Sequence, residues 1–142
     1  MSVNDPHSKN LGLIWGLRVL GVIDMLALIA VVMPLDWMSR INDLCGLAPL
    51  PNSHIVGYLA RTTSALYALH GALVLFISCD VNRYRPLITF LAIAAVVHGG
   101  ILLAIDLASG MPFFWTLVEG PSFVATGVII WWLQRRTIAF PR

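Results

Sequence analysis

Residues 53–80, SHIVGYLARTTSALYALHGALVLFISCD, form an apolar run long enough to cross a lipid bilayer. The run predicts a membrane-spanning helix over about residues 53–77. It also carries Arg61, Tyr67 and His70 within its apolar sequence. Because an ionisable side chain is costly at membrane depth, these residues should face protein or a water-filled cavity and have partners there.

The whole chain has the composition of a membrane protein. Its 142 residues are 58% hydrophobic and only 11% charged, with a mean hydropathy of +0.84. A soluble domain is usually about one quarter charged. The length allows one domain. A net charge of +2, without a basic run interleaved with aromatics, gives no indication of a nucleic-acid partner.

Three further apolar runs predict three more spanning helices. The first run, residues 11–33, is longer than the apolar core of about 7–15 residues in a signal peptide, and no cleavage site follows it, so we expect a retained helix. Short turns and the absence of an internal repeat predict an all-α, integral membrane, up-down-up-down antiparallel four-helix bundle. The predicted organisation is a polar N-terminal tail (1–10), a four-helix domain (11–134) with spans at about 11–33, 53–77, 86–108 and 112–134 and an interfacial segment at 36–44, and a basic C-terminal tail (135–142).

The distribution of basic residues predicts the orientation. Cytoplasmic ends of spans are enriched in Lys and Arg. With both termini inside, six basic residues lie on the cytoplasmic side and one, Arg40, lies outside. We therefore expect a multi-pass protein of the cytoplasmic (inner) membrane with both termini in the cytoplasm. The six inside residues are Lys9, Arg83, Arg85, Arg135, Arg136 and Arg142.

Each predicted span contributes one ionisable side chain at a similar depth. Counting from the outer helix ends at about 1.5 Å per residue places Arg61 and Glu119 about 10 Å deep, and Asp24 and His98 about 14–15 Å deep. The counts predict a polar cluster in the outer half of the membrane. Its predicted members are Asp24, Arg61, Ser64, Tyr67, His98 and Glu119.

The cluster has two interpretations. It could hold a lipid headgroup, a quinone head, a small molecule or a transferred proton, as intramembrane charges often do. Alternatively, it could be structural, with an Arg61–Glu119 ion pair and with Asp24 hydrogen-bonded to His98, Tyr67 or Ser64. Outside the cluster, Asp106 lies two residues from its helix end and is expected to be hydrated.

Neither haem nor a metal is predicted as a resident cofactor. His70 and His98 could be axial ligands of haem b, but their counted depths of about 24 and 15 Å do not match. No CxxCH motif is present. Asp24, His98 and Glu119 are of the ligand types that metals use, but no HExxH or ExxH spacing supports a site. His70 alone is more often a hydrogen-bonded core residue than a ligand.

The sequence carries no catalytic motif, so no catalytic residue is predicted. This favours a non-enzymatic accessory or interaction subunit of a larger membrane complex or homo-oligomer, with membrane lipids around it and a lipid or quinone-like ligand at its polar cluster. The alternatives are a small-molecule or proton-coupled transporter, a haem-binding redox protein, and a membrane enzyme acting on lipid.

The pattern Arg61, Tyr67, Gly71 on the second of four short apolar helices, followed by a basic turn, resembles the DoxX-like family of small bacterial membrane proteins. The resemblance covers about residues 11–134. It implies a four-helix bundle with a role beside respiratory or redox membrane systems, and it brings no catalytic residue with it. His70 does not match the family pattern.

Overall fold

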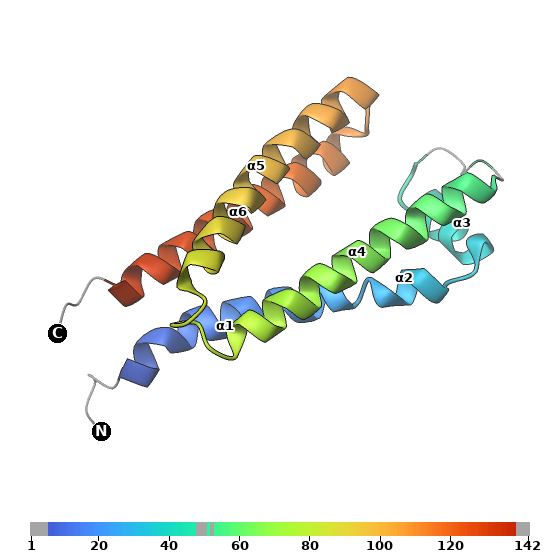
Figure 1. Ribbon diagram of the computed structural model, residues 1–142. Coiled ribbons are helices and arrows are strands. Elements are labelled where there is room, and N and C mark those ends of the chain that lie inside the picture. Colours follow the sequence, from blue (N-terminus) through green and yellow to red (C-terminus); the bar gives the residue numbers. More distant parts are fainter. Residues whose placement is uncertain (1–5, 48–50, 52, 139–142) are drawn as a thin grey trace. The chain divides into compact units, whose positions relative to one another are not determined.

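The structure is a computed structural model that describes residues 6–47, 51 and 53–138. Within these residues the chain is helical, with no β-strand. Of the predicted tails, 1–10 and 135–142, residues 1–5 and 139–142 lie outside the described residues. The helices are α1 (Pro6–Met25), α2 (Leu28–Val32), α3 (Leu35–Leu44), α4 (His54–Ser78), α5 (Arg85–Ser109) and α6 (Phe113–Ile138) (Figure 1).

Four stretches of the described chain are long and apolar enough to cross a membrane. They are Asn10–Val32, His54–Ser78, Arg85–Ser109 and Phe113–Arg136. The all-α membrane class predicted from the sequence is therefore confirmed. The predicted interfacial segment corresponds to α3, whose apolar side chains Trp37 and Leu44 are 62% and 87% exposed.

The first span is not the single continuous helix that was predicted. Helix α1 ends at Met25 and α2 begins at Leu28. Between them the backbone winds into tighter turns, with hydrogen bonds from the Ala27 N–H to the Asp24 carbonyl (3.1 Å) and from the Ile29 N–H to the Leu26 carbonyl (3.0 Å). No proline lies at the break, so apolar periodicity could not reveal it. Short stretches of this winding within a helix often mark functional positions.

Two compact units make up the chain. The first unit is residues 18–76, and the second is residues 1–17 together with 77–142. In the first unit, α1 and α4 cross at two glycines. A Cβ at Gly71 would lie 2.6 Å from the carbonyl oxygen of Gly21, so the two backbones are in direct contact. Further along, Gly57 of α4 packs against the side chain of Leu35. Small residues permit this close approach in membranes.

In the second unit, α5 and α6 form an antiparallel hairpin held together in the same way. A Cβ at Gly99 would lie 2.5 Å from the carbonyl oxygen of Gly120, and a Cβ at Gly127 would lie 2.5 Å from that of Ala92. The hairpin turns at Gly110, whose φ of 65° is left-handed and suits glycine at a helix end. These contacts run along the whole hairpin, so its register is fixed by backbone contact.

A polar connection closes the opposite end of the hairpin. The Gln134 side chain, which is 2% exposed, donates from Nε2 to the carbonyl of Arg85 at 2.8 Å. The Thr89 hydroxyl lies 3.1 Å from Gln134 Oε1 and 3.1 Å from the Arg85 carbonyl oxygen. The largest fully buried side chains of this unit are Leu13, Ile77 and Ile88.

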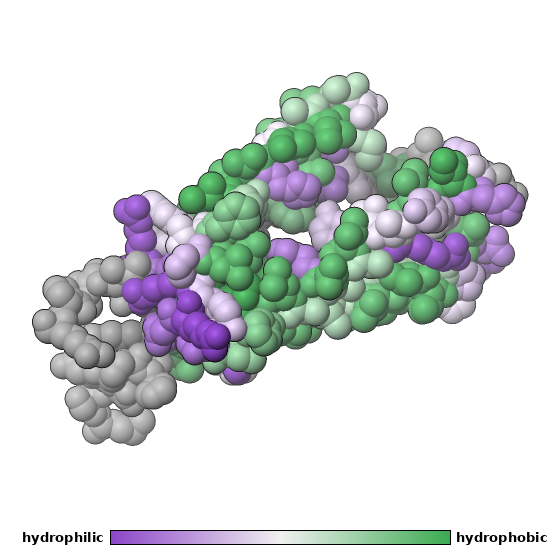
Figure 2. Space-filling view, viewed as in Figure 1, coloured by the Kyte–Doolittle hydropathy of each residue, from purple (hydrophilic) through white to green (hydrophobic). Residues whose placement is uncertain are grey.

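Large apolar side chains cover the flanks of the helices. Val32, Leu69 and Phe113 are 81%, 67% and 78% exposed, and Figure 2 shows apolar residues in green over long stretches of the visible surface. A surface of this kind suits a hydrocarbon environment, where apolar side chains do not need to be buried against each other. Together with the four spans, it defines a multi-pass membrane protein.

Candidate functional site

A histidine and an aspartate meet inside the membrane-spanning part of the first unit. The Nδ1 atom of His70 on α4 lies 2.8 Å from Oδ2 of Asp24 on α1. The Asp24 side chain is 14% exposed and the His70 side chain 41%. Asp24 is eight residues from the end of its span at Val32, and His70 is eight residues from Ser78, so each lies about 12 Å from a helix end. The pair is therefore far from either membrane surface.

The glycine crossing positions this pair. Gly21 precedes Asp24 by one helical turn, and Gly71 directly follows His70. A Cβ at Gly71 would also lie 2.9 Å from the Cβ of Asp24, so the absence of a side chain lets α1 approach closely enough for the hydrogen bond. The break after Met25 follows immediately, so the pair lies at the last regular turn of α1.

Sequence counting placed His70 about 10 Å deeper than Asp24, and this estimate of their relative depth is wrong. Counting assumed that His54 is level with Met33. In the structure Gly21 faces Gly71, and Leu35 faces Gly57, so α4 begins alongside α3. Because the two segments run antiparallel, the same alignment places Met33 opposite about residue 59. The offset of five residues corresponds to about 8 Å. Had the counting placed Gly21 opposite Gly71, it would have predicted that Asp24 and His70 lie at the same depth.

Arg61 has a local partner in the same unit. Its Nη2 donates to the carbonyl oxygen of Met33 at 3.1 Å. Met33 is the C-cap of α2 and precedes Pro34. The end of a helix carries partial negative charge and unsatisfied carbonyls, so a guanidinium is favourable there. This contact accounts for one of the donors of Arg61.

Ser64 and Tyr67 lie on the same face of α4 as Arg61, at successive spacings of three residues, and are partly buried. This face continues through Gly71 to the crossing with α1. The first unit thus holds five of the polar residues singled out in the sequence on facing sides of α1–α2 and α4. They are Asp24, Arg61, Ser64, Tyr67 and His70.

The remaining two predicted cluster residues lie in the second unit and have contacts within their hairpin. The Trp115 indole N–H donates to the carboxylate of Glu119 one turn along α6. The ring of His98 on α5 packs edge-on against Phe123 of α6, with centroids 5.0 Å apart. The His98 residue is exposed. A single site formed by all four spans therefore stays a prediction, and haem ligation by His70 and His98 stays the alternative that it was in the sequence.

Asp106 is buried, contrary to the expectation that it is hydrated. It is 4% exposed, and its Oδ2 has no hydrogen-bond partner among the described residues. The burial follows from its position on the face of α5 that also carries Ala92 and Gly99, toward α6. Over residues 6–47, 51 and 53–138, no three His, Cys, Asp or Glu side chains come together as metal ligands.

The fold and this site define an α-helical multi-pass membrane protein with a carboxylate–imidazole pair within its spans. No family model, curated protein or solved structure matches the chain. Its function is therefore inferred from the chemistry of the site, and the DoxX-like resemblance stays a prediction.

Proposed function

We propose that the protein is a non-enzymatic membrane subunit that binds a quinone-like ligand through His70. The observation that carries the proposal is the 2.8 Å hydrogen bond between His70 and Asp24 at membrane depth, with the imidazole side chain 41% exposed and the carboxylate nearly covered. One ring nitrogen is committed to Asp24. The other, Nε2, remains to interact with a ligand.

The protonation chemistry of the pair favours an acceptor ligand. A net charge is costly in the hydrocarbon core, so the pair is best accommodated with one negative and one positive group or with both groups neutral. When Asp24 and His70 together carry no net charge, Nε2 carries a hydrogen, because the proton shared with Asp24 lies between Nδ1 and the carboxylate. A His70–Asp24 pair with no net charge therefore presents the Nε2–H group as a hydrogen-bond donor, which matches the carbonyl acceptor of a quinone.

Depth favours a quinone over a phospholipid headgroup at this position. The hydrocarbon core is about 30 Å thick, and headgroups lie at its boundaries. The pair lies about 12 Å from the nearest helix ends. A quinone ring is soluble in hydrocarbon and can reach this depth, whereas a charged headgroup cannot without a large cost.

Isothermal titration calorimetry tests the proposal. A short-chain ubiquinone analogue is titrated into the purified protein in detergent. His70→Gln keeps a side-chain donor for Asp24 but loses the imidazole, and we expect at least tenfold weaker binding, since a charge-assisted hydrogen bond is worth about 1.5–3 kcal/mol. The matched control is His98→Gln, a membrane histidine whose ring packs on Phe123. Equal affinities of the wild type and His70→Gln would contradict the proposal. A Soret band that disappears in His70→Gln would establish haem in place of quinone.

A second candidate, proton-coupled transport, is favoured by the break in the first span beside Asp24. Interrupted helices accompany ion and proton sites in transporters. In liposomes with an internal pH dye, this function requires a proton flux that Asp24→Asn abolishes. A wild-type flux no greater than that of empty liposomes would exclude it.

As a subunit, the protein would reside in the cytoplasmic membrane with both termini inside and associate with a larger complex or with itself. The support for association is the absence of a catalytic motif in this sequence and the exposed apolar flanks. Gentle extraction followed by size-exclusion chromatography tests it. A monodisperse monomer that retains no partner would argue against a subunit role.

A further inference from the structure

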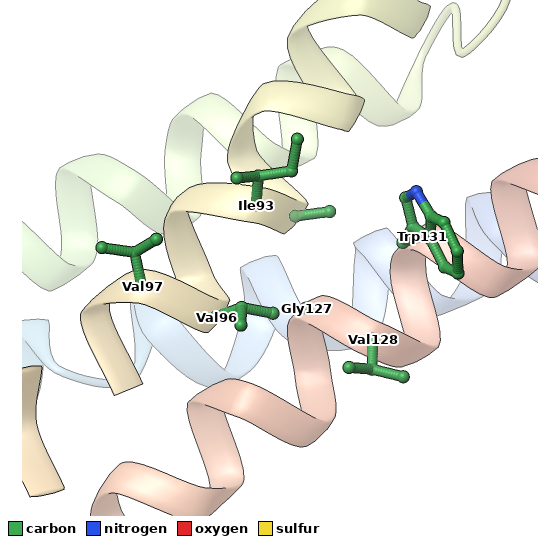
Figure 3. Close-up of a pocket in the computed structure, with 7 residues that line it drawn as sticks. Ile93, Val96, Val97, Gly127, Val128 and Trp131 are labelled. Carbon is green, nitrogen blue, oxygen red and sulfur yellow. The ribbon is translucent and has the colours of Figure 1, made fainter. Parts of the chain in front are cut away.

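The α5–α6 hairpin carries an apolar groove that the proposed function does not use. The groove has a volume of about 340 Å³, within the range of about 300–1,000 Å³ that is usual for ligand pockets. Figure 3 shows its lining residues on the two facing helices, with the Trp131 ring at one end. The groove is lined by Ala92, Ile93, Val96, Val97, Gly127, Val128 and Trp131.

The groove has its shape because no side chain fills its floor. A Cβ at Gly127 would lie 2.5 Å from the Ala92 carbonyl oxygen and 2.8 Å from a Val96 methyl group, so the helices touch there. The rims are formed by larger side chains such as Ile93, Val97 and Val128, which are 55%, 56% and 49% exposed. The result is an elongated apolar depression whose rim side chains are exposed within the hairpin unit.

One end of the groove carries a positive charge. The guanidinium of Arg135 stacks on the ring of Trp131 at 3.9 Å from its centroid, one helical turn beyond the groove. The described residues at this end of the hairpin, 77–88 and 131–136, contain four arginines and one carboxylate. That carboxylate, Asp80, accepts a hydrogen bond from the backbone N–H of Arg83 at 3.0 Å. The arginines are Arg83, Arg85, Arg135 and Arg136.

The groove also lies at the right depth for a lipid tail. Arg85 begins its span, and Val97 lies twelve residues further on, about 18 Å from the helix end. The Trp131 end lies about one turn, or 5–6 Å, inside Arg135. An arginine at the boundary and an apolar channel running inward from it correspond to the phosphate and the acyl chain of one lipid.

We propose that this groove binds an anionic phospholipid, with an acyl chain along Gly127 and Val128 and the phosphate at Arg135. The charge distribution favours a lipid over a second copy of the chain. Two parallel copies related by a two-fold axis and packed groove against groove would bring their Arg135 side chains toward each other, and like charges at an interface are unfavourable.

Native mass spectrometry of the full-length protein, titrated with dioleoyl phosphatidylglycerol and dioleoyl phosphatidylcholine, tests the proposal. We expect several-fold tighter binding of phosphatidylglycerol, and we expect Arg135→Gln to weaken it about fivefold, since one arginine at an anionic lipid contributes about 1 kcal/mol. Arg136→Gln is the matched control, because Arg136 stacks on Trp132, which does not line the groove. It should leave the affinity within twofold. Equal losses in the two variants would overturn the assignment.

The acyl-chain position is tested separately. Val128→Phe fills the groove from its exposed rim and should weaken both lipids about tenfold, whereas Val118→Phe, at a 65% exposed position on the same helix, should not. Both substitutions are at exposed sites, and circular dichroism checks that the helices persist. If Val128→Phe instead converts a dimer to a monomer while lipid binding is unchanged, the groove is an interface between copies and the lipid proposal fails. Neither result depends on quinone binding at His70.

Discussion

The crossing of α1 and α4 gives a sharp prediction: Gly71→Ala should separate the two helices and break the His70–Asp24 hydrogen bond. The added Cβ would lie 2.6 Å from the Gly21 carbonyl oxygen, where ordinary contact begins at 3.4 Å. The obstructing atoms are two backbone atoms, of Gly21 and Met25, and the Cβ of Asp24, which is fixed to the backbone, so no side-chain rotation relieves the clash.

The magnitude follows from these distances. Relief requires a local separation of about 0.8 Å, which would stretch the 2.8 Å hydrogen bond to about 3.6 Å, beyond the usual limit of about 3.2 Å. Overpacking costs about 1–3 kcal/mol and the lost charge-assisted bond about 1.5–3 kcal/mol. The higher helix propensity of alanine relative to glycine offsets about 1 kcal/mol of this loss in unfolding free energy. We expect a net loss of about 1.5–5 kcal/mol and a fall in Tm of roughly 5–20 °C.

Thermal unfolding in detergent, followed by circular dichroism, measures this loss. Gly100→Ala is the matched control, since a Cβ there meets nothing within 4 Å and should be neutral or slightly stabilising. If the hydrogen bond is already broken in Gly71→Ala, adding His70→Phe, which has no hydrogen-bonding atom, should change Tm little further, so the two substitutions would not be additive. A Tm for Gly71→Ala equal to that of Gly100→Ala, or full additivity with His70→Phe, would refute the reasoning.

Two further substitutions test contacts within the units. Gln134→Leu removes the buried donor to the Arg85 carbonyl and should lower the free energy of unfolding by about 1–3 kcal/mol. Thermal unfolding in detergent measures the loss. An unchanged Tm would show that the hairpin end does not depend on the Gln134 hydrogen bond. Arg61→Met keeps the apolar stem of the side chain but removes the donor to the Met33 carbonyl. One such hydrogen bond contributes about 1 kcal/mol to the free energy of local opening, so amide hydrogen exchange at the α2–α3 junction should become about three- to tenfold faster. Exchange at wild-type rates would mean that this bond does not hold the junction in place.

The membrane class and the approximate spans could be predicted from composition and run length. Both depend on hydrophobicity averaged over about twenty residues, which tertiary contacts do not alter. The same averaging explains why the break after Met25 was missed. Leu26 and Ala27 are as apolar as their neighbours, and only the backbone hydrogen bonds distinguish them.

The partners of the polar residues could not be predicted in the same way. Depth counted from helix ends depends on how the helices are aligned, and α4 is shifted by about five residues from the assumed alignment because it begins alongside α3. An error of about 8 Å is larger than the reach of a hydrogen bond, so a carboxylate can be assigned to the wrong partner although its own position in the helix is correct.

The sequence by itself determined that this chain spans a membrane four times and that it carries ionisable groups where they are costly. The tertiary structure alone decided that Asp24 binds His70, that Arg61 reaches the end of α2 and that Asp106 is buried. The physical reason is that hydropathy is a property of each residue, whereas register is set where two backbones touch, here at Gly21 and Gly71.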